Sequence, residues 1–260
     1  MKKQAHSTYI RDLLEEAVLK YNRPGFIEDD PISVPHLFTK KEDREISGFF
    51  AATLAWGQRK TILANATRIV RVMDMQPHDF VLHHSAADLK AFVGFVHRTF
   101  NDSDLLFFIQ ALRNVYTKNG GLEPLFAEGL QRTGNMNDAI GYVKDVFFDT
   151  EHLPRSRKHV SDPRKGSAAK RLHMYLRWMV RKDDAGVDFG IWNSIPPALL
   201  MPPLDLHSGR VARRLGLLTR TQDDRRAVEE LYARLAELDP EDPVKYDFAL
   251  YGLGVFEKMK

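Results

Sequence analysis

The 260-residue sequence contains no cysteine. This absence excludes disulfide bonds, thiol catalysis, cysteine-ligated zinc and iron–sulfur clusters. We expect no cofactor and no bound metal.

Long apolar runs and strand patterns are also lacking. No apolar run approaches the roughly 18 residues of a membrane span, so we expect no membrane partner. The first residues, Met1-Lys-Lys-Gln-Ala-His, lead into charged positions and do not resemble a signal peptide, which predicts a cytoplasmic protein. Alternating Val/Ile/Thr runs and Asn-Gly turns are nearly absent, whereas helical spacing recurs throughout the chain. The sequence therefore predicts an all-α fold.

Positive charge is concentrated in one part of the chain, although the net charge is only +3. Residues 155–182 contain ten Lys or Arg residues and a single acid, Asp162. A clustered basic segment in a nearly neutral protein favours a polyanionic partner. A solvated basic loop is the alternative interpretation.

Asp205 stands at the start of the most informative segment, residues 201–217. It is a good N-cap for a helix from about Leu206 to Leu215, which Gly216 ends. This helix carries Arg210 and two further arginines. One interpretation is a structural cap followed by solvated arginines, and the other is a catalytic carboxylate on a surface that holds an anionic polymer.

The segment 203–217, Pro-Leu-Asp-Leu-His-Ser-Gly-Arg-Val-Ala-Arg-Arg-Leu-Gly-Leu, resembles "V-D-T-H-V-x-R-V-x-x-R-L-G-L" of the helix-hairpin-helix DNA glycosylases, the endonuclease III superfamily. In that superfamily the aspartate is the catalytic acid, which implies this role for Asp205 and matches His207 to the histidine that follows. Residues 170–183 and 203–207 also resemble "K-R-L-N-M-x-L-R-W-M-V-R-K-D" and "P-L-D-x-H" of an uncharacterised bacterial family of helical proteins. That family implies no activity.

An elbow between two expected helices, about 39–56 and 60–75, carries Trp56-Gly-Gln-Arg59. Thr39 to Glu42 has the spacing of a capping box before the first of these helices. The elbow resembles "L-S-A-Q-A-T-D" of endonuclease III, whose glutamine enters the gap left by an extruded base. Gln58 takes that position, while Arg59 and Lys60 lie at a helix N-terminus, which attracts phosphate. The alternative is a polar turn residue.

The expected helix 167–182 places Lys170 at or near the catalytic lysine of bifunctional glycosylases, if it is aligned with the helix that follows their hairpin. Its spacing predicts a core stripe of Leu172, Tyr175, Leu176 and Met179, with Lys170, His173, Arg177 and Arg181 on the opposite side. A solvated helix lysine is the alternative. The hairpin "L-P-G-V-G-x-K-T-A" is replaced after Pro154 by a longer basic loop, so this DNA contact is altered or absent.

The resemblance implies a two-lobed, glycosylase-like helical fold with a central cleft and no iron–sulfur cluster. We expect a helical barrel at 40–182 and a second lobe at 183–260, against which 1–39 packs. It also implies a base-excision protein, an N-glycosylase with possible lyase activity on a flipped base, with Asp205 and Lys170 as catalytic residues. The expected partner is nucleic acid, in the form of duplex DNA. The residues that would bind it are Gln58, Arg59, Lys60, Arg164, Lys165, Ser167, Arg171, Arg177, His207 and Arg210.

Two other functions fit the same sequence. One is a protein that binds nucleic acid without catalysis, which the missing hairpin glycines favour. The other is a metal-dependent phosphohydrolase, with His36, His78, Asp79 and Asp145 as ligands. The distance between the side chains of Lys170 and Asp205 discriminates best between a catalytic site and a simple helix cap.

Overall fold

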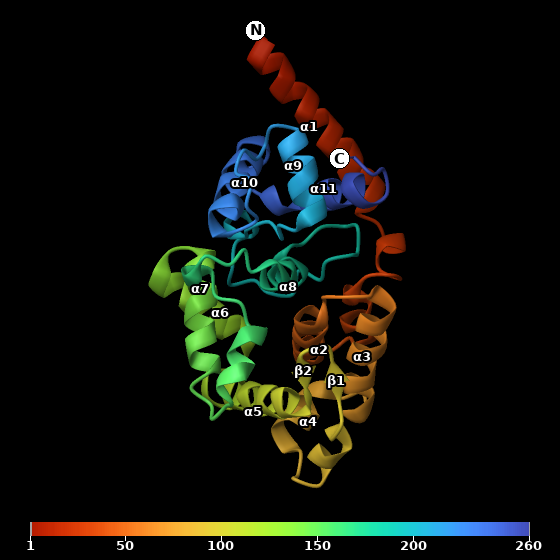
Figure 1. The fold of residues 1–260 in the computed structure, drawn as a ribbon, viewed down its shortest axis with the longest axis vertical. Helices are drawn as coiled ribbons and strands as arrows, with labels where there is room; N and C mark the ends of the chain where they lie inside the picture. The colour runs from red at the N-terminus through yellow and green to blue at the C-terminus, as the bar shows by residue number, and fades with distance from the viewer. Residues whose placement is uncertain (1, 260) are drawn as a thin grey trace. The chain divides into compact units, whose positions relative to one another are not determined.

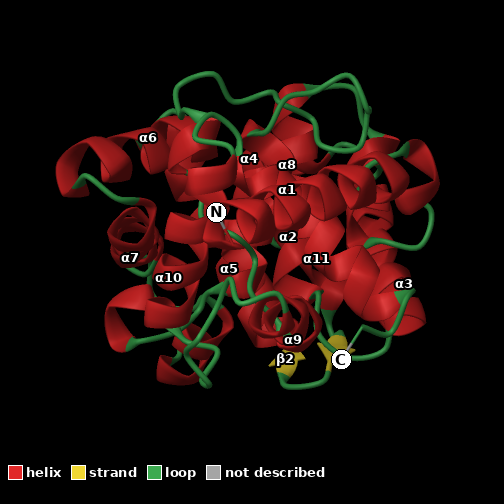
Figure 2. Cartoon of the chain, turned by 90° about the horizontal axis from the view of Figure 1, so that it is seen from above, coloured by secondary structure: helices red, strands yellow, loops and turns green. Residues whose placement is uncertain are grey.

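The computed structural model describes residues 2–259, with side chains described from residue 8 onward. The predicted all-α fold is confirmed, because helices account for most of the chain in Figure 2. The strands of the described residues are β1 (Val96–His97) and β2 (Phe100–Asn101). They form one antiparallel hairpin, with His97 opposite Phe100. This short hairpin was not anticipated from the sequence pattern.

The chain divides into two compact units, and the first is discontinuous in sequence. Unit 1 comprises residues 1–26 and 163–260, whereas unit 2 comprises residues 27–162. The domains expected from the sequence, with boundaries after residues 39 and 182, stay a prediction. Each unit is described by itself below.

Unit 2 is built on helices whose aromatic side chains form its core. Phe108 is fully buried and contacts the rings of Phe49, Phe100 and Phe147. Its elements besides the hairpin are α2 (Lys41–Leu54), α3 (Arg59–Val72), α4 (Pro77–His83), α5 (Asp102–Lys118), α6 (Leu122–Thr133), α7 (Met136–Phe147) and the 3-10 helices η2 (Pro31–Ser33), η3 (Pro35–Leu37), η4 (Asp88–Phe92) and η5 (Pro154–His159).

The starts of two helices in unit 2 differ in how they are capped. Asn101 caps α5 in a capping box with Asp104, in which the side chain of each residue accepts a hydrogen bond from the backbone N–H of the other. The capping box expected at Thr39–Glu42 is wrong. The N-cap of α2 is Lys40, whose side chain makes no capping hydrogen bond.

In unit 1 the first and last helices of the described chain pack together. Helix α11 packs against α1 and also against α9, as Figure 1 shows within this unit. Its elements are α1 (Lys2–Tyr21), α8 (Lys170–Val180), α9 (Leu206–Arg214), α10 (Arg225–Leu238), α11 (Tyr246–Val255) and the 3-10 helices η1 (Pro24–Phe26), η6 (Pro163–Lys165), η7 (Pro197–Leu199) and η8 (Pro243–Lys245).

Helix α8 is shorter and more deeply buried than its spacing predicts. The expected helix 167–182 narrows to Lys170–Val180, and every residue from Leu172 to Val180 is buried. A helix that is covered on all sides has no solvated face. The polar side expected for His173, Arg177 and Arg181 is therefore corrected, since all three side chains are in the interior of unit 1.

Candidate functional site

Helix α8 begins at Lys170 directly after a residue with an unusual backbone conformation. Ala169, the N-cap, is buried and has φ +42° and ψ +35°, in the left-handed region. This region is uncommon for a residue that carries a Cβ atom. The carbonyl of Ala169 nevertheless accepts hydrogen bonds from the backbone N–H groups of Leu172 and His173. The turn at Ala169 thus fixes the direction in which the side chain of Lys170 leaves the helix.

Asp205 caps α9 as the sequence predicts. One carboxylate oxygen, Oδ1, accepts from the backbone N–H groups of His207 and Ser208 at 2.8 and 3.0 Å. The hydroxyl of Ser208 accepts in return from the backbone N–H of Asp205 at 2.9 Å. This capping box orients the carboxylate through Oδ1 and leaves Oδ2 for another partner.

Lys170 provides that partner. Its Nζ lies 3.3 Å from Oδ2 of Asp205, and the two side chains are 33% and 19% exposed. Burial alone would raise the pKa of Asp205, but the charge of Lys170 and the N–H of Ser208 outweigh it and lower this pKa below its usual value. The structure therefore brings the two predicted catalytic residues together as a solvent-accessible ion pair in unit 1.

A larger cluster of charges surrounds the far end of α8. Arg177 donates to Asp188 on the following loop and to Asp247 on α11. Its guanidinium also lies over the ring of Phe248, with 4.1 Å between the guanidinium carbon and the ring centroid. Arg177 is only 3% exposed and is paired on both sides, which gives it a structural role, and its expected contact with nucleic-acid phosphate stays a prediction.

Arg181 extends this cluster by one helical turn. It forms ion pairs with Asp183, Asp188 and Asp242 at 2.6, 3.2 and 2.9 Å. Burial would lower the pKa of Arg181, but these three carboxylates outweigh it and raise the pKa. Arg177 and Arg181 together face four aspartates, so the cluster has more acidic than basic groups.

Asp247 connects the cluster electrostatically to the Lys170–Asp205 pair. Burial raises the pKa of Asp247 to about 6 against the opposing charge of Arg177, and the negative charge of Asp205 contributes to this rise. The excess of aspartates in the cluster favours a raised pKa of Asp247, whereas the direct contact with Arg177 favours its ionised form. Asp247 was not singled out from the sequence, because nothing local to residue 247 indicates that α11 turns it towards α8.

Two further predicted residues follow Asp205 on α9. His207 and Arg210 line a small pocket of about 160 Å³ together with Lys258 and the backbone of Gly254. A Cβ atom at Gly254 would lie 3.0 Å from the carbonyl oxygen of His207, so glycine permits the close approach of α9 and α11 here. The side chains of Arg210 and Lys258 give this pocket a positive character.

Four other predicted residues lie in the segment before α8 or in its first turn. Arg164 and Lys165 are exposed in η6, whereas Ser167 and Arg171 are half-buried. Ser167 forms an isolated β-bridge with Asp224, and its hydroxyl accepts from the backbone N–H of Ala169 at 3.1 Å. Ser167 therefore has a local structural role in addition to any contact with a ligand.

The predicted elbow is confirmed as a connection between α2 and α3, and it belongs to unit 2. Gln58 is the exposed N-cap of α3 with an extended backbone, and its side chain makes no capping hydrogen bond. Arg59 and Lys60 are exposed in the first turn. Gly57 has φ +111°, and a Cβ atom there would lie 3.1 Å from the side chain of Arg98. The elbow thus requires glycine before Gln58.

A comparison with protein families gives one match. A family model described as "Protein of unknown function (DUF2400)" matches residues 30–256. The chain belongs to this family. No curated protein and no solved structure matches the chain. The expected membership of an uncharacterised family is therefore confirmed, and the DUF2400 description assigns no activity to Lys170 or Asp205.

No helix within residues 2–259 is both long and apolar enough to cross a membrane. In the same part of the chain, no group of three or more His, Asp or Glu side chains is arranged to hold a metal ion.

Proposed function

We propose that this DUF2400 member binds DNA and removes a base from a flipped nucleotide, with Lys170 and Asp205 as its catalytic pair. The observation that carries the proposal is the 3.3 Å separation of Lys170 Nζ and Asp205 Oδ2 in a partly exposed position. A carboxylate beside an amine suits cleavage of an N-glycosidic bond. The glycosylase resemblance of residues 203–217 gives the same assignment for Asp205.

The environment of Asp205 favours an electrostatic role in this chemistry. Two backbone N–H groups fix its carboxylate, and its lowered pKa keeps it ionised at neutral pH. Such a carboxylate stabilises positive charge that develops on the sugar as the bond to the base breaks. The bonding electrons leave with the base, which takes up a proton, and water adds to the anomeric carbon.

Lys170 supports a second, linked step. As an ammonium group in the ion pair it is not a nucleophile, so a bound substrate must separate the pair and Lys170 must lose a proton. The free amine then attacks C1′ of the abasic sugar, whose C1′–O4′ bond breaks as the ring opens. The oxygen left on C1′ departs as water, and the resulting imine permits strand cleavage by elimination. We therefore propose that Asp205-dependent base removal is the primary activity and that lyase activity is secondary.

Each of the two units contributes exposed basic residues to the proposed DNA surface. In unit 1 these are Arg164, Lys165 and Arg210, and His207 lies one helical turn before Arg210 on α9. In unit 2 they are Arg59 and Lys60, next to Gln58, which we propose fills the gap left by the flipped base. The two-lobed glycosylase-like arrangement with a central cleft belongs to this proposal as well.

Salt-dependent binding tests the DNA surface. Titration of a labelled duplex at two salt concentrations is expected to show weaker binding at the higher concentration. The substitutions Lys60→Gln and Lys165→Gln should each reduce the dependence on salt, with little effect on sequence preference. Binding that does not change with salt would exclude the surface.

A panel of duplexes with oxidised, alkylated, deaminated and abasic sites tests the chemistry. Asp205→Asn keeps an N-cap of similar quality and should abolish base release. Lys170→Ala should abolish borohydride-trapped adducts with abasic DNA. Matched controls are Asp224→Asn, at the N-cap of α10, and Lys245→Ala, a lysine that is paired with Asp239. Both controls should retain activity, and activity that survives in Asp205→Asn would overturn the catalytic assignment.

A DNA-binding protein without catalysis is the second candidate. The observation that favours it is the complete use of the Asp205 carboxylate, since Oδ1 caps α9 and Oδ2 pairs with Lys170. The glycine-rich hairpin of the glycosylases is also replaced by the basic loop after Pro154. Salt-dependent binding together with no base release and no trapped adduct on any duplex would support this candidate.

A further inference from the structure

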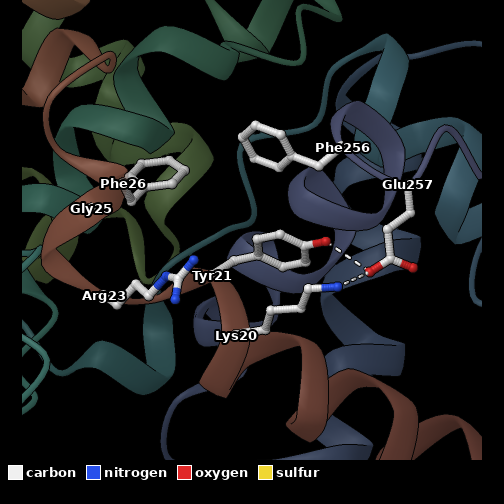
Figure 3. Close-up of a pocket in the computed structure, with 7 residues that line it drawn as sticks. All are labelled: Lys20, Tyr21, Arg23, Gly25, Phe26, Phe256 and Glu257. Carbon is white, nitrogen blue, oxygen red and sulfur yellow. Dashed lines mark hydrogen bonds and ion pairs between the residues drawn. The ribbon is translucent and has the colours of Figure 1, made fainter.

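A second pocket in unit 1 has features that the Lys170–Asp205 site does not use. It has a volume of about 390 Å³ and lies where the end of α1 and the residues of η1 meet the residues after α11. This volume falls within the range of about 300–1,000 Å³ that is typical of small-ligand sites. Figure 3 shows its lining, in which the side chains of Tyr21, Phe26 and Phe256 surround one opening.

Aromatic rings form the walls of this pocket. The rings of Tyr21 and Phe256 are stacked, with 5.5 Å between their centroids and 17° between their planes. This spacing is that of rings in contact, so a ligand cannot enter between them and must lie against their open side. Phe256 is 57% exposed, so much of its ring is accessible to a ligand.

The opposite wall is Phe26, whose ring is held by two edge contacts. Its centroid lies 5.3 Å from that of Phe248 and 6.0 Å from that of Tyr251, with 77° between the planes in both pairs. Gly25 precedes it and lines the pocket with backbone alone. A planar group therefore meets aromatic surface on two sides of the opening.

The charges of the pocket favour an anion. Glu257 accepts from Lys20 Nζ at 2.8 Å and from the hydroxyl of Tyr21 at 2.7 Å, so it neutralises Lys20. These two hydrogen bonds lower the pKa of Glu257 and keep it ionised. Arg23 is exposed and forms no ion pair with any residue that the structure describes. Its guanidinium is the unneutralised charge of the lining, turned towards the space beside Phe26 in Figure 3.

We propose that this pocket binds one unpaired nucleotide, with the base against Phe256 and Phe26 and the phosphate on Arg23. Aromatic side chains bind bases by stacking without strong sequence preference, and arginine binds phosphate through a planar pair of N–H groups. The ligand has two possible sources, a free nucleoside monophosphate or an unpaired nucleotide within a single strand. The pocket does not depend on base removal, because none of its lining residues belongs to the Lys170–Asp205 site.

The test uses 2-aminopurine, whose fluorescence is quenched when it stacks. The probes are its nucleoside, its nucleoside 5′-monophosphate and a short single-stranded oligonucleotide that contains it. We expect saturable quenching with the monophosphate, the oligonucleotide or both. Phe256→Ala should weaken binding by roughly fivefold or more. Arg23→Gln should weaken binding of the phosphate-bearing probes and leave that of the nucleoside unchanged.

Matched controls separate the pocket from the rest of the surface. Leu19→Ala removes another exposed apolar side chain, 81% exposed on α1, and Arg226→Gln removes an exposed arginine on α10. Neither residue lines the pocket, and neither change should alter the affinity. The Asp205→Asn variant should also bind the probes normally. A failure of the proposed catalysis can therefore be told apart from a failure of nucleotide binding in this pocket.

A second variant guards against loss of folding in Phe256→Ala. A Cβ atom at Gly25 would meet nothing within 4 Å, so a side chain can start there, and the indole of Gly25→Trp is expected to occupy the pocket. It should abolish quenching while thermal unfolding stays normal. Binding only by the oligonucleotide assigns the ligand to a strand, and binding by the monophosphate assigns it to a free nucleotide. No quenching with any probe, or equal affinity in wild type, Phe256→Ala and Gly25→Trp, would overturn the proposal.

Discussion

The two ends of α8 present the same kind of charge in opposite surroundings. At its start, Lys170 is 33% exposed and pairs with one carboxylate, that of Asp205. At its end, Arg177 is 3% exposed and contacts two carboxylates, in a cluster in which aspartates outnumber arginines. Both pairs have good geometry, so distance alone does not distinguish a reactive site from a structural one. Exposure and the number of counter-charges make the distinction.

The largest effect is expected where the buried arginine is removed. Arg177→Met keeps an unbranched side chain of similar length but leaves Asp188 and Asp247 without their shared partner. The free energy of unfolding should fall by about 3–5 kcal/mol in urea titrations. Arg226→Met, at an exposed position on α10, should change it by no more than about 0.5 kcal/mol. A loss below about 1 kcal/mol for Arg177→Met would show that the cluster is not a structural element.

The buried aspartates predict a dependence of stability on pH. The pKa of Asp247 is raised to about 6, so the folded protein retains a proton that the unfolded chain has already lost. The contribution of Asp247 to stability is complete below the ordinary aspartate pKa of 3.8 and is lost as pH rises through about 6. The full shift corresponds to about 3 kcal/mol as an upper bound.

Comparison with Asp247→Asn isolates this effect from other groups. Asp205 and Asp183 have lowered pKa values and act in the opposite direction, because their contribution is lost as pH falls. Both groups remain in the variant, so the difference between the two proteins reports Asp247. Relative to wild type, the variant should gain stability between pH 4 and pH 7. A constant difference across this range would contradict the raised pKa.

A smaller effect is expected at the cap of α9. Asp205→Ala removes the acceptor for the N–H groups of His207 and Ser208 and should cost about 1 kcal/mol. Asp205→Asn should lower the free energy of unfolding by only a few tenths of about 1 kcal/mol, since asparagine caps nearly as well. The pair of variants separates capping from charge, measured as the free energy of unfolding. Equal losses for both would show that the charge, and not the cap, stabilises α9.

The smallest effect on stability is expected at the exposed start of α8. Lys170→Met breaks a partly exposed ion pair, whose contribution after solvent screening is between about 0 and 1 kcal/mol. A double-mutant cycle with Asp205→Asn measures this coupling directly. A coupling above about 2 kcal/mol would place Lys170 with Arg177 among the structural charges.

Local signals in the sequence predict the elements that depend on neighbouring residues. The helix after Asp205 begins where its cap predicts, and the elbow between α2 and α3 lies at the expected residues. Both features are decided within a few residues, by a side-chain cap and by glycine at position 57. The all-α class follows in the same way from recurrent helical spacing.

Features that depend on distant partners escaped the sequence analysis. The polar stripe of α8 is buried because Asp188, Asp242 and Asp247 arrive from later segments and neutralise its arginines. The aromatic pocket joins Tyr21 to Phe256, which are far apart in the chain and have no shared motif. Periodicity describes one element at a time, so it cannot predict which charged face finds a counter-charge.

The division of unit 1 into two sequence segments has a consequence for synthesis on the ribosome. Residues 27–162, which make the compact unit 2, are complete before residues 163–260 have been translated. Helix α1 must meanwhile wait for α11, its packing partner at the other end of the described chain. Domains generally fold as units during synthesis. The nascent chain should therefore gain protease resistance first in residues 27–162, while α1 stays unprotected until α11 has been synthesised.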